Sequence, residues 1–424
     1  MATEPLTAEL PAALVERLAR AGRAAQRALA LLSHDAKAAA LRAAAGQLRT
    51  NTAAILAANQ RDMAAGAVQG LSAALLDRLR LDPARLGAMA AAVEEIAALP
   101  DPVGQVIDTA QRPNGLELSR VRVPIGLIGI IYESRPNVTA DAAALCLASG
   151  NAVLLRGGSE AVHSNCAIHA AMTAGLMQAG VPAGAVQLLP TQDRAAVGAM
   201  LAATGLIDMI VPRGGKRLVA RVQADARVPV LAHLDGICHT YIHGAADPAK
   251  ACAIAFNAKL RRTGVCGAME TLLIDAQFPA APVVLKALLE AGCAVRGDAR
   301  ACAIDPRIAP AVPEDWDTEY LDAVLSVAIV DGLDDALRHI AQHSSAHTDV
   351  IVSEDRAVCE RFLAEVDSAI VMANASSQFA DGGEFGLGAE IGIATGRLHA
   401  RGPVALEGLT TYKWLVRGSG QIRP

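Results

Sequence analysis

Residues 257–275 read NAKLRRTGVCGAMETLLID, and the rest of the chain is organised around this stretch. The sequence predicts a helix over residues 249–260, so the helix ends within this stretch. Asp247 is a favoured N-cap residue and Pro248 suits the first helical position, so the start of this helix is well defined. Residues 271–274 are apolar or β-branched and predict a strand. A helix that turns directly into a buried strand is typical of α/β proteins.

The turn between this helix and this strand contains a cysteine with glycines on both sides. Gly264 and Gly267 flank Cys266, so the backbone can bend there and a substrate can approach the sulfur closely. Arg261 and Arg262 add positive charge nearby, which favours the thiolate over the thiol. Two interpretations follow: a nucleophilic cysteine, or a small buried cysteine that only fills the junction.

The composition excludes several classes of function. The 424 residues are 53% hydrophobic and 19% charged, which indicates a globular chain long enough for two or three domains. The net charge of −5 and the scattered Lys and Arg residues give no footprint for a nucleic acid. No apolar run reaches the roughly 18 residues of a membrane helix, and the N-terminus lacks the pattern of a secretory signal. The eight cysteines lack CxxC pairs and metal-ligand spacing, so we expect a reducing cytoplasm and no metal site.

Short apolar runs alternate with helical stretches between residues 121 and 233. The predicted strands cover residues 125–132, 152–155, 186–189, 207–211 and 228–231. Strands that alternate with helices form a parallel sheet covered on both faces, and ligands bind beyond the carboxyl ends of its strands. Polar segments follow three of these strands, at residues 132–137, 156–160 and 212–216. The dinucleotide pattern GxGxxG is absent, and we interpret Gly126 and Gly129 as sites of close packing inside a strand.

Three further regions complete the predicted organisation. Residues 8–100 predict helices rich in Ala, Leu and Arg. Asn114-Gly115 separates two strand-like runs and predicts a hairpin able to pair with another subunit. Residues 252–374 repeat the alternation of strands and helices, so we expect a second α/β unit, followed by a glycine-dense loop and a last strand over residues 410–416.

The residues alone leave three classes of function open. A glycine-flanked cysteine in one α/β unit and polar, glycine-rich loops in another favour cofactor-assisted chemistry through a thio-intermediate. A Cys–His hydrolase would need one of the ten histidines beside Cys266, and the sequence does not show which one approaches it. A non-catalytic structural protein is the third class, although polar strand ends and the lack of repeats disfavour it.

Five segments of the chain, taken in order, resemble one family. They are VPIGLIGIIYESRPNVT at residues 123–139, HLDGICH at residues 233–239, the Cys266 segment ending METLL, SAHTD at residues 345–349 and EFGLGAEIG at residues 384–392. On these segments the chain resembles the gamma-glutamyl phosphate reductase family, also called glutamate-5-semialdehyde dehydrogenases, within the aldehyde dehydrogenase superfamily. The resemblance covers almost the whole chain.

This resemblance implies an α/β fold of the aldehyde dehydrogenase type, with two doubly wound α/β domains plus an oligomerisation hairpin and tail. The NADP-binding domain is expected over residues 1–105 and 124–235, the catalytic domain with the nucleophilic cysteine over residues 236–395, and the hairpin and tail over residues 106–123 and 396–424. The implied activity is NADPH-dependent reduction of L-glutamyl 5-phosphate to L-glutamate 5-semialdehyde and phosphate, the second step of proline biosynthesis from glutamate. The alternatives are another acylating aldehyde dehydrogenase and the Cys–His hydrolase.

The resemblance also implies which residues catalyse the reaction. Cys266 is the implied nucleophile, and its attack on the acyl phosphate gives a thioester. Asn137 matches the asparagine that donates to the developing oxyanion, although the interval from Pro124 to Asn137 is longer than in ordinary aldehyde dehydrogenases. Where hydrolytic relatives have a glutamate base, this chain has His233, and a reductase that keeps its thioester from water benefits from omitting a strong base.

The implied cofactor contacts come from several segments. Arg156 matches the lysine that binds the adenosine ribose, and Ser159 stands where many NAD-dependent relatives carry a glutamate. Because serine with an arginine nearby accepts a 2′-phosphate, we expect NADPH over NADH. The remaining implied contacts are Arg213, Gly214 and Gly215 for the pyrophosphate and Glu319 for the nicotinamide ribose.

The sequence also offers candidates for binding the substrate, and the resemblance implies partners. Arg135 and Arg262 are candidates for binding the carboxylate and the phosphate, because guanidinium groups bind oxyanions bidentately, and His233 is a candidate for meeting the phosphate or orienting the substrate. The family resemblance further implies a cytoplasmic homo-oligomer, a dimer or tetramer. A glutamate 5-kinase is a possible partner that would protect the labile acyl phosphate.

Overall fold

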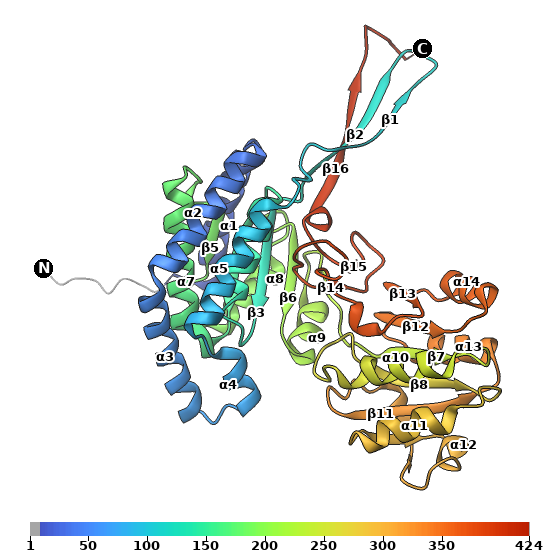
Figure 1. The fold of residues 1–424 in the computed structure, drawn as a ribbon. Helices are drawn as coiled ribbons and strands as arrows, with labels where there is room; N and C mark the ends of the chain where they lie inside the picture. Colours follow the sequence, from blue (N-terminus) through green and yellow to red (C-terminus); the bar gives the residue numbers. More distant parts are fainter. Residues whose placement is uncertain (1–8, 424) are drawn as a thin grey trace, which may run out of the picture. The chain divides into compact units, whose positions relative to one another are not determined.

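A computed structural model describes residues 9–423 of the chain, which form two compact units (Figure 1). The first unit comprises the chain up to Ala232, Leu387–Gly392 and the part from Val404 onward. The second unit comprises His233–Gly386 and Ile393–Pro403. The first unit is therefore assembled from three separate segments of the chain, and its last two come after nearly all of the second unit.

Helices occupy the start of the first unit, as the composition predicts. They are α1 (Pro11–Leu29), α2 (His34–Thr50), α3 (Thr52–Val68), α4 (Ala73–Leu79) and α5 (Pro83–Ala98). Ser33, Ser72 and Asp82 cap α2, α4 and α5, because each side chain accepts a hydrogen bond from a backbone N–H in the first turn. Helices α2 and α3 pack against α7 (Val162–Gln178), while α1 packs against the sheet.

The first unit contains a four-stranded parallel sheet with the strand order β5-β4-β3-β6. The strands are β3 (Leu127–Tyr132), β4 (Ala152–Gly157), β5 (Val186–Leu188) and β6 (Met209–Arg213), joined through α6 (Val138–Ala148), α7, α8 (Arg194–Ala202) and, beyond β6, α9 (Lys216–Asp225). The fold class is confirmed, but the strand predicted at residues 228–231 is wrong. Only Val230 forms an isolated bridge, with Ile210, because Pro229 has no N–H to extend a ladder.

Two glycines inside or beside β3 are required for close packing, as predicted. A Cβ on Gly129 would lie 2.5 Å from Ile210 Cδ1 of the neighbouring strand. Gly126 has φ +139° and a Cβ there would lie 2.1 Å from Asp208 Oδ2. Both positions therefore exclude side chains for packing reasons.

The predicted hairpin consists of β1 (Val106–Gln111) and β2 (Glu117–Pro124), which pair antiparallel. The last strand, β16 (Thr410–Arg417), adds to the other edge of β2 and completes a three-stranded sheet (Figure 1). Large side chains of β16 remain exposed: Tyr412, Trp414 and Val416. The Arg120 guanidinium lies 5.2 Å from the Tyr412 ring centroid and 5.6 Å from the Trp414 ring centroid.

The second unit contains a seven-stranded parallel sheet with the order β10-β9-β11-β8-β7-β12-β13. Its strands are β7 (Cys238–Ile242), β8 (Met269–Asp275), β9 (Ala294–Gly297), β10 (Ala309–Pro310), β11 (Val324–Val330), β12 (Thr348–Val352) and β13 (Ile370–Ala373). Its helices are α10 (Pro248–Leu260), α11 (Ala281–Glu290), α12 (Ala299–Cys302), α13 (Leu333–His343) and α14 (Arg356–Glu365). A short antiparallel pair, β14 (Ile393–Ala394) and β15 (Gly402–Pro403), also belongs to this unit.

Alternate residues of the second sheet pack into different cores. Leu272 belongs to the core formed with α10 and α11, whereas Leu273 belongs to the core formed with α13 and α14. This period of two means that both faces of β8 are covered, and every residue of the strand is buried. The predicted cap of α10 is confirmed, because the Asp247 side chain accepts from the Lys250 N–H. Within residues 9–423, none of the helices is long and apolar enough to span a bilayer.

Candidate active site

Cys266 lies in the turn between α10 and β8, and its side chain is half-buried. The turn is closed by the Ala268 N–H, which donates to the Val265 carbonyl at 3.0 Å. Gly267 is buried, and a Cβ there would lie 3.1 Å from the Ser377 carbonyl oxygen. The sulfur is therefore held at the start of a buried strand rather than sealed inside a core.

Two histidines approach this sulfur. One ligand-capable atom each of His233, Cys266 and His347 lies within 4.8 Å of the other two. The rings of His233 and His347 meet edge to face, with centroids 5.0 Å apart. His233 was among the predicted site residues, whereas His347 was not, although its segment SAHTD carries part of the family resemblance.

Hydrogen bonds fix the orientation of both imidazole rings. His233 Nδ1 lies 2.7 Å from the Ile393 carbonyl oxygen and donates to it, because a carbonyl only accepts. His347 is fully buried, and its Nδ1 lies 2.9 Å from Thr348 Oγ1. Burial, together with the neighbouring His233, lowers the pKa of His347 to about 3, so its imidazole is neutral at physiological pH.

The backbone of Cys266 is held by the first residue of β7 and by the segment just before it. Cys238 is fully buried, and its Sγ–H donates to the Cys266 carbonyl oxygen at 3.1 Å. Burial raises the pKa of the Cys238 thiol well above its usual value, so Cys238 stays protonated and serves as a donor. Gly236 lies against the same backbone, and its N–H donates to Glu319 Oε1 at 3.0 Å.

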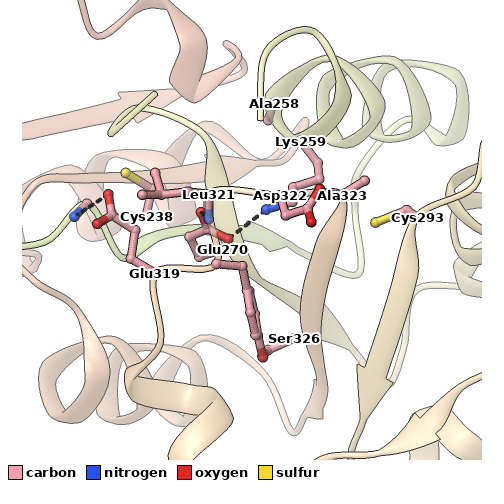
Figure 2. A network of polar contacts seen from close by, with 12 residues as sticks. Cys238, Ala258, Lys259, Glu270, Cys293, Glu319, Leu321, Asp322, Ala323 and Ser326 are labelled. Atoms are coloured by element: carbon pink, nitrogen blue, oxygen red, sulfur yellow. Dashed lines mark hydrogen bonds and ion pairs between the residues drawn. The ribbon is translucent and has the colours of Figure 1, made fainter. Parts of the chain in front are cut away.

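A buried ion pair supports the segment that carries Glu319. Lys259 Nζ lies 2.6 Å from Glu270 Oε2, and both side chains are fully buried (Figure 2). Glu270 Oε1 also accepts from the Leu321 N–H at 3.3 Å. Burial raises the pKa of the Glu270 carboxyl against the opposing effect of Lys259. The pair thus links α10 and β8 to the segment before β11.

These residues share one edge of the second sheet. Glu319, Cys266, His233 and His347 precede β11, β8, β7 and β12, which are consecutive neighbours in the sheet. All four segments therefore lie at the amino ends of parallel strands. The candidate site of this unit is therefore at the edge opposite to the carboxyl ends, where ligands of such sheets usually bind.

In the first unit, by contrast, the predicted cofactor residues lie at the carboxyl ends of strands or just after them. Arg156 is half-buried near the end of β4, where Nη1 donates to the Gly157 carbonyl and Nη2 to the Gln192 carbonyl. Its Nε is buried and has no hydrogen-bond partner among the described residues. Burial, and then the charge of nearby Arg194, lower the pKa of Arg156 against the effect of Glu160. Ser159 is exposed at the start of the next helical turn.

The loop after β6 is partly engaged by a carboxylate. Gly214 and Gly215 are exposed at the start of α9, and the Gly215 N–H donates to Glu133 Oε2 at 3.3 Å. Helix N-termini favour anions, and here Glu133 takes this position. The Arg213 guanidinium lies beside Gly392, where a Cβ would be 2.9 Å from Nη1, and its charge also acts on Asp141.

The remaining predicted residues are exposed, each on its own unit. Asn137 precedes α6, and its Nδ2 donates to Asp141 Oδ2 at 2.8 Å. Burial raises the pKa of Asp141 to about 6, against this hydrogen bond and the charge of Arg213. Arg135 is exposed close by in the first unit, and Arg262 is exposed near Cys266 in the second.

Comparisons with known proteins agree with one another. The model of the aldehyde dehydrogenase family matches residues 6–296. The chain is 72% identical to the gamma-glutamyl phosphate reductase of Novosphingobium aromaticivorans and 69% identical to that of Sphingopyxis alaskensis, with 100% of each chain covered. The crystal structure of gamma-glutamyl phosphate reductase from Thermotoga maritima is similar with a TM-score of 0.95 and 41% identity, over 97% of this chain and 100% of that one. An acetylating aldehyde dehydrogenase from Geobacillus thermoglucosidasius, 16% identical with a TM-score of 0.67 over 98% of each chain, shares the fold.

Proposed function

The chain belongs to the gamma-glutamyl phosphate reductases of the aldehyde dehydrogenase family, and from this we propose that it reduces L-glutamyl 5-phosphate with NADPH to L-glutamate 5-semialdehyde and phosphate. This reaction is the second step of proline biosynthesis from glutamate. The observation that carries the proposal within the molecule is the half-buried Cys266 sulfur beside two imidazoles at the edge of the second sheet.

Cys266 is the nucleophile of the proposed mechanism. His233 donates its Nδ1–H to the Ile393 carbonyl, so its other nitrogen, Nε2, is the atom that accepts the thiol proton. The thiolate attacks the C5 carbonyl, the bond from that carbon to the phosphate oxygen breaks, and a thioester remains. When bound, NADPH supplies the hydride that reduces this thioester. The C–S bond of the resulting thiohemiacetal then breaks, which releases the aldehyde and leaves a thiolate. The proton held by His233 returns to the sulfur and restores the thiol.

Other residues orient the substrate. Asn137 donates to the oxyanion that develops on the carbonyl, in the first unit next to Asp141, which fixes its amide. Arg135 and Arg262 bind the carboxylate and phosphate of the substrate, since guanidinium groups suit oxyanions. His233, beside the sulfur, orients the substrate. His347, whose low pKa keeps it neutral, does not act as a proton donor at physiological pH.

The first unit contains residues that fit a nucleotide with a 2′-phosphate. The buried Arg156 Nε without a partner among the described residues, and the nearby Arg194, offer donors and positive charge to an anion beside Ser159. Arg213, Gly214 and Gly215 contact the pyrophosphate if Glu133 moves away from the Gly215 N–H. Glu319, held by Gly236, binds the nicotinamide ribose from the second unit.

The division of labour, the partners and the compartment are parts of the same proposal. Residues 1–105 and 124–235 bind NADP, residues 236–395 carry out the chemistry, and residues 106–123 and 396–424 join subunits. Exposed Tyr412, Trp414 and Val416 on β16 support a homo-oligomer, a dimer or tetramer. A glutamate 5-kinase supplies the labile acyl phosphate, and the need for a reduced thiol favours the cytoplasm.

The decisive variant is Cys266→Ser. We expect it to abolish NADP reduction by glutamate semialdehyde in the presence of phosphate, while its circular dichroism spectrum stays that of the wild type. Cys166→Ser, an exposed thiol of the first unit, is the matched control and keeps full activity. Activity of Cys266→Ser at the wild-type rate would remove Cys266 from the mechanism.

The dependence of the reaction on phosphate, coenzyme A and nicotinamide separates the alternatives. Another acylating aldehyde dehydrogenase would use a thiol such as coenzyme A in place of phosphate. A Cys–His hydrolase would act on its substrate without any nicotinamide. Absorbance of the reduced nicotinamide, recorded with phosphate, with coenzyme A and with neither, distinguishes the three.

A further inference from the structure

The cluster of Cys266, His233 and His347 has a composition that suits a metal ion as well as an acyl group. One ligand atom of each residue lies within 4.8 Å of the others. Thiolate sulfur and imidazole nitrogen are the ligands that zinc prefers, and three protein ligands with an open fourth position are a common arrangement. The three residues come from separate segments, so their spacing in the sequence gives no sign of such a site.

His347 offers an atom that nothing else in the described chain uses. Its ring is fully buried, and Nε2 has no hydrogen-bond partner among residues 9–423. Its other nitrogen, Nδ1, contacts Thr348 Oγ1 at 2.9 Å and Cys238 Sγ at 3.6 Å. Nε2 is therefore the nitrogen that remains for a ligand, and a buried polar atom of this kind normally has a partner.

His233 already has the orientation of a metal-binding histidine. A ligating imidazole commonly donates its other N–H to a carbonyl, which fixes the ring and leaves the second nitrogen for the metal. His233 Nδ1 donates in this way to the Ile393 carbonyl at 2.7 Å. Cys266 is half-buried, so an ion from solvent can reach the cluster on its side.

We propose that Cys266, His233 and His347 form a site for a thiophilic divalent cation, Zn²⁺, which reversibly blocks the nucleophile. Zinc bonds of roughly 2.0–2.1 Å to nitrogen and 2.3 Å to sulfur place the ligand atoms of a tetrahedral site about 3.3–3.6 Å apart. From separations within 4.8 Å, the ligand atoms therefore close by up to about 1.5 Å. Binding releases the thiol proton to solvent and involves no redox change. The inhibitory consequence rests on the proposed function of Cys266, whereas the binding itself does not.

Binding is measured on the full chain without substrate or cofactor, reduced and free of any histidine tag. Zn²⁺ affinity is obtained by competition with a chromophoric chelator, and Co²⁺ is the spectroscopic probe, since a thiolate-to-Co²⁺ charge-transfer band reports sulfur ligation. We expect one Zn²⁺ per chain and this band in the wild type. Cys266→Ala loses the band and binds at least about 100-fold more weakly, and His347→Gln and His233→Gln each weaken binding at least about 10-fold.

Matched controls are available for each ligand type. Cys166→Ser removes an exposed thiol of the first unit, and His343→Gln removes a histidine of the second unit that bonds to Asp317. Both keep the wild-type affinity and the band. An unchanged affinity in Cys266→Ala, or in both histidine variants, overturns the proposal, as does a wild type without the charge-transfer band.

A second measurement decides the case if a histidine variant does not fold. Zn²⁺ protects Cys266 of the wild type from alkylation by iodoacetamide, located by peptide mass mapping, over the same concentrations at which it binds. Undiminished alkylation of Cys266 at saturating Zn²⁺ overturns the proposal. Because neither measurement uses substrate or NADPH, loss of the reductase proposal leaves the zinc result intact, and the reverse also holds.

Discussion

Gly236 and Cys266 lie backbone against backbone. A Cβ on Gly236 would lie 2.2 Å from the Cys266 carbonyl oxygen and 2.7 Å from its Cα. The same Gly236 donates its N–H to Glu319. The absence of a side chain at residue 236 therefore sets the positions of both Cys266, the proposed nucleophile, and Glu319, the proposed ribose-binding carboxylate.

Gly236→Ala should displace Cys266 while the rest of the second unit stays folded. A shift of about 1 Å in a reacting group lowers activity on the order of 100-fold, so we expect kcat/KM to fall by about 10–100-fold. Steady-state rates and the alkylation rate of Cys266 measure the effect. Gly264→Ala is the matched control in the same turn, because nothing in the described chain lies within 4 Å of a Cβ there. Equal loss in both variants would show that the turn is simply intolerant of alanine.

Removing one partner of the Lys259–Glu270 pair should destabilise the protein strongly. Lys259→Met leaves the Glu270 carboxyl buried without its cation, and such losses cost about 3–5 kcal/mol. The double variant Lys259→Met/Glu270→Gln should regain most of this, because glutamine is neutral and still accepts from the Leu321 N–H. Urea unfolding of the wild type, the single variants and the double variant gives the coupling energy. Additive effects would mean that the pair contributes no specific stability.

Cofactor preference should depend on Ser159. A glutamate at this position would repel a 2′-phosphate beside Arg156, so Ser159→Glu should raise the KM for NADPH by at least about tenfold, equivalent to ~1.4 kcal/mol, with little change for NADH. Ser159→Ala, which adds no charge, controls for the loss of the hydroxyl. If the ratio of the KM for NADPH to the KM for NADH is the same in Ser159→Glu and the wild type, the cofactor argument is wrong.

Stability should fall as the pH drops below neutrality, in part because of His339. Burial, together with nearby His239 and His343, lowers the pKa of His339 to about 3. The unfolded chain binds a proton near pH 6.5, whereas the folded chain does not until about pH 3. Between these values each such histidine costs up to ~1.4 kcal/mol of stability per pH unit of acidification.

His339→Gln tests this slope, because glutamine does not titrate. Urea unfolding between pH 5 and pH 7.5 should show a shallower loss of stability in this variant than in the wild type. His34→Gln, at an exposed position of α2, should leave the wild-type slope unchanged. A slope that is identical in all three proteins contradicts the assignment.

The first unit was largely predictable from the sequence. Its strands are continuous apolar runs and its polar segments follow them, so the residues after β3, β4 and β6 could be placed at one edge of a parallel sheet. The interaction of Arg156 with Arg194 could not be predicted, because it depends on how the segment before α8 returns to β4. The capped helix α10 and strand β8 were also recognised, from Asp247, Pro248 and the apolar or β-branched residues 271–274.

The surroundings of Cys266 were harder to predict from the sequence. The pairing of β8 with β7, and of β7 with β12, brings His233 and His347 to the sulfur, and this strand order is not written in any local pattern. The short elements β9, α12 and β10 were missed for a related reason. Residues 294–297 alternate between exposed and buried over only four positions, too few for a periodic signal.

The order of translation affects when the sheet of β1, β2 and β16 can be completed. The free edge of β2 is filled by β16, which emerges from the ribosome only after the whole second unit has been translated. At roughly 5–20 residues per second, that delay is on the order of 15–60 seconds. An open strand edge invites wrong partners, and positively charged side chains discourage them. The positive charges of Arg120 and Arg122 on β2 therefore disfavour pairing of the nascent hairpin with other chains until β16 has been translated and pairs with β2.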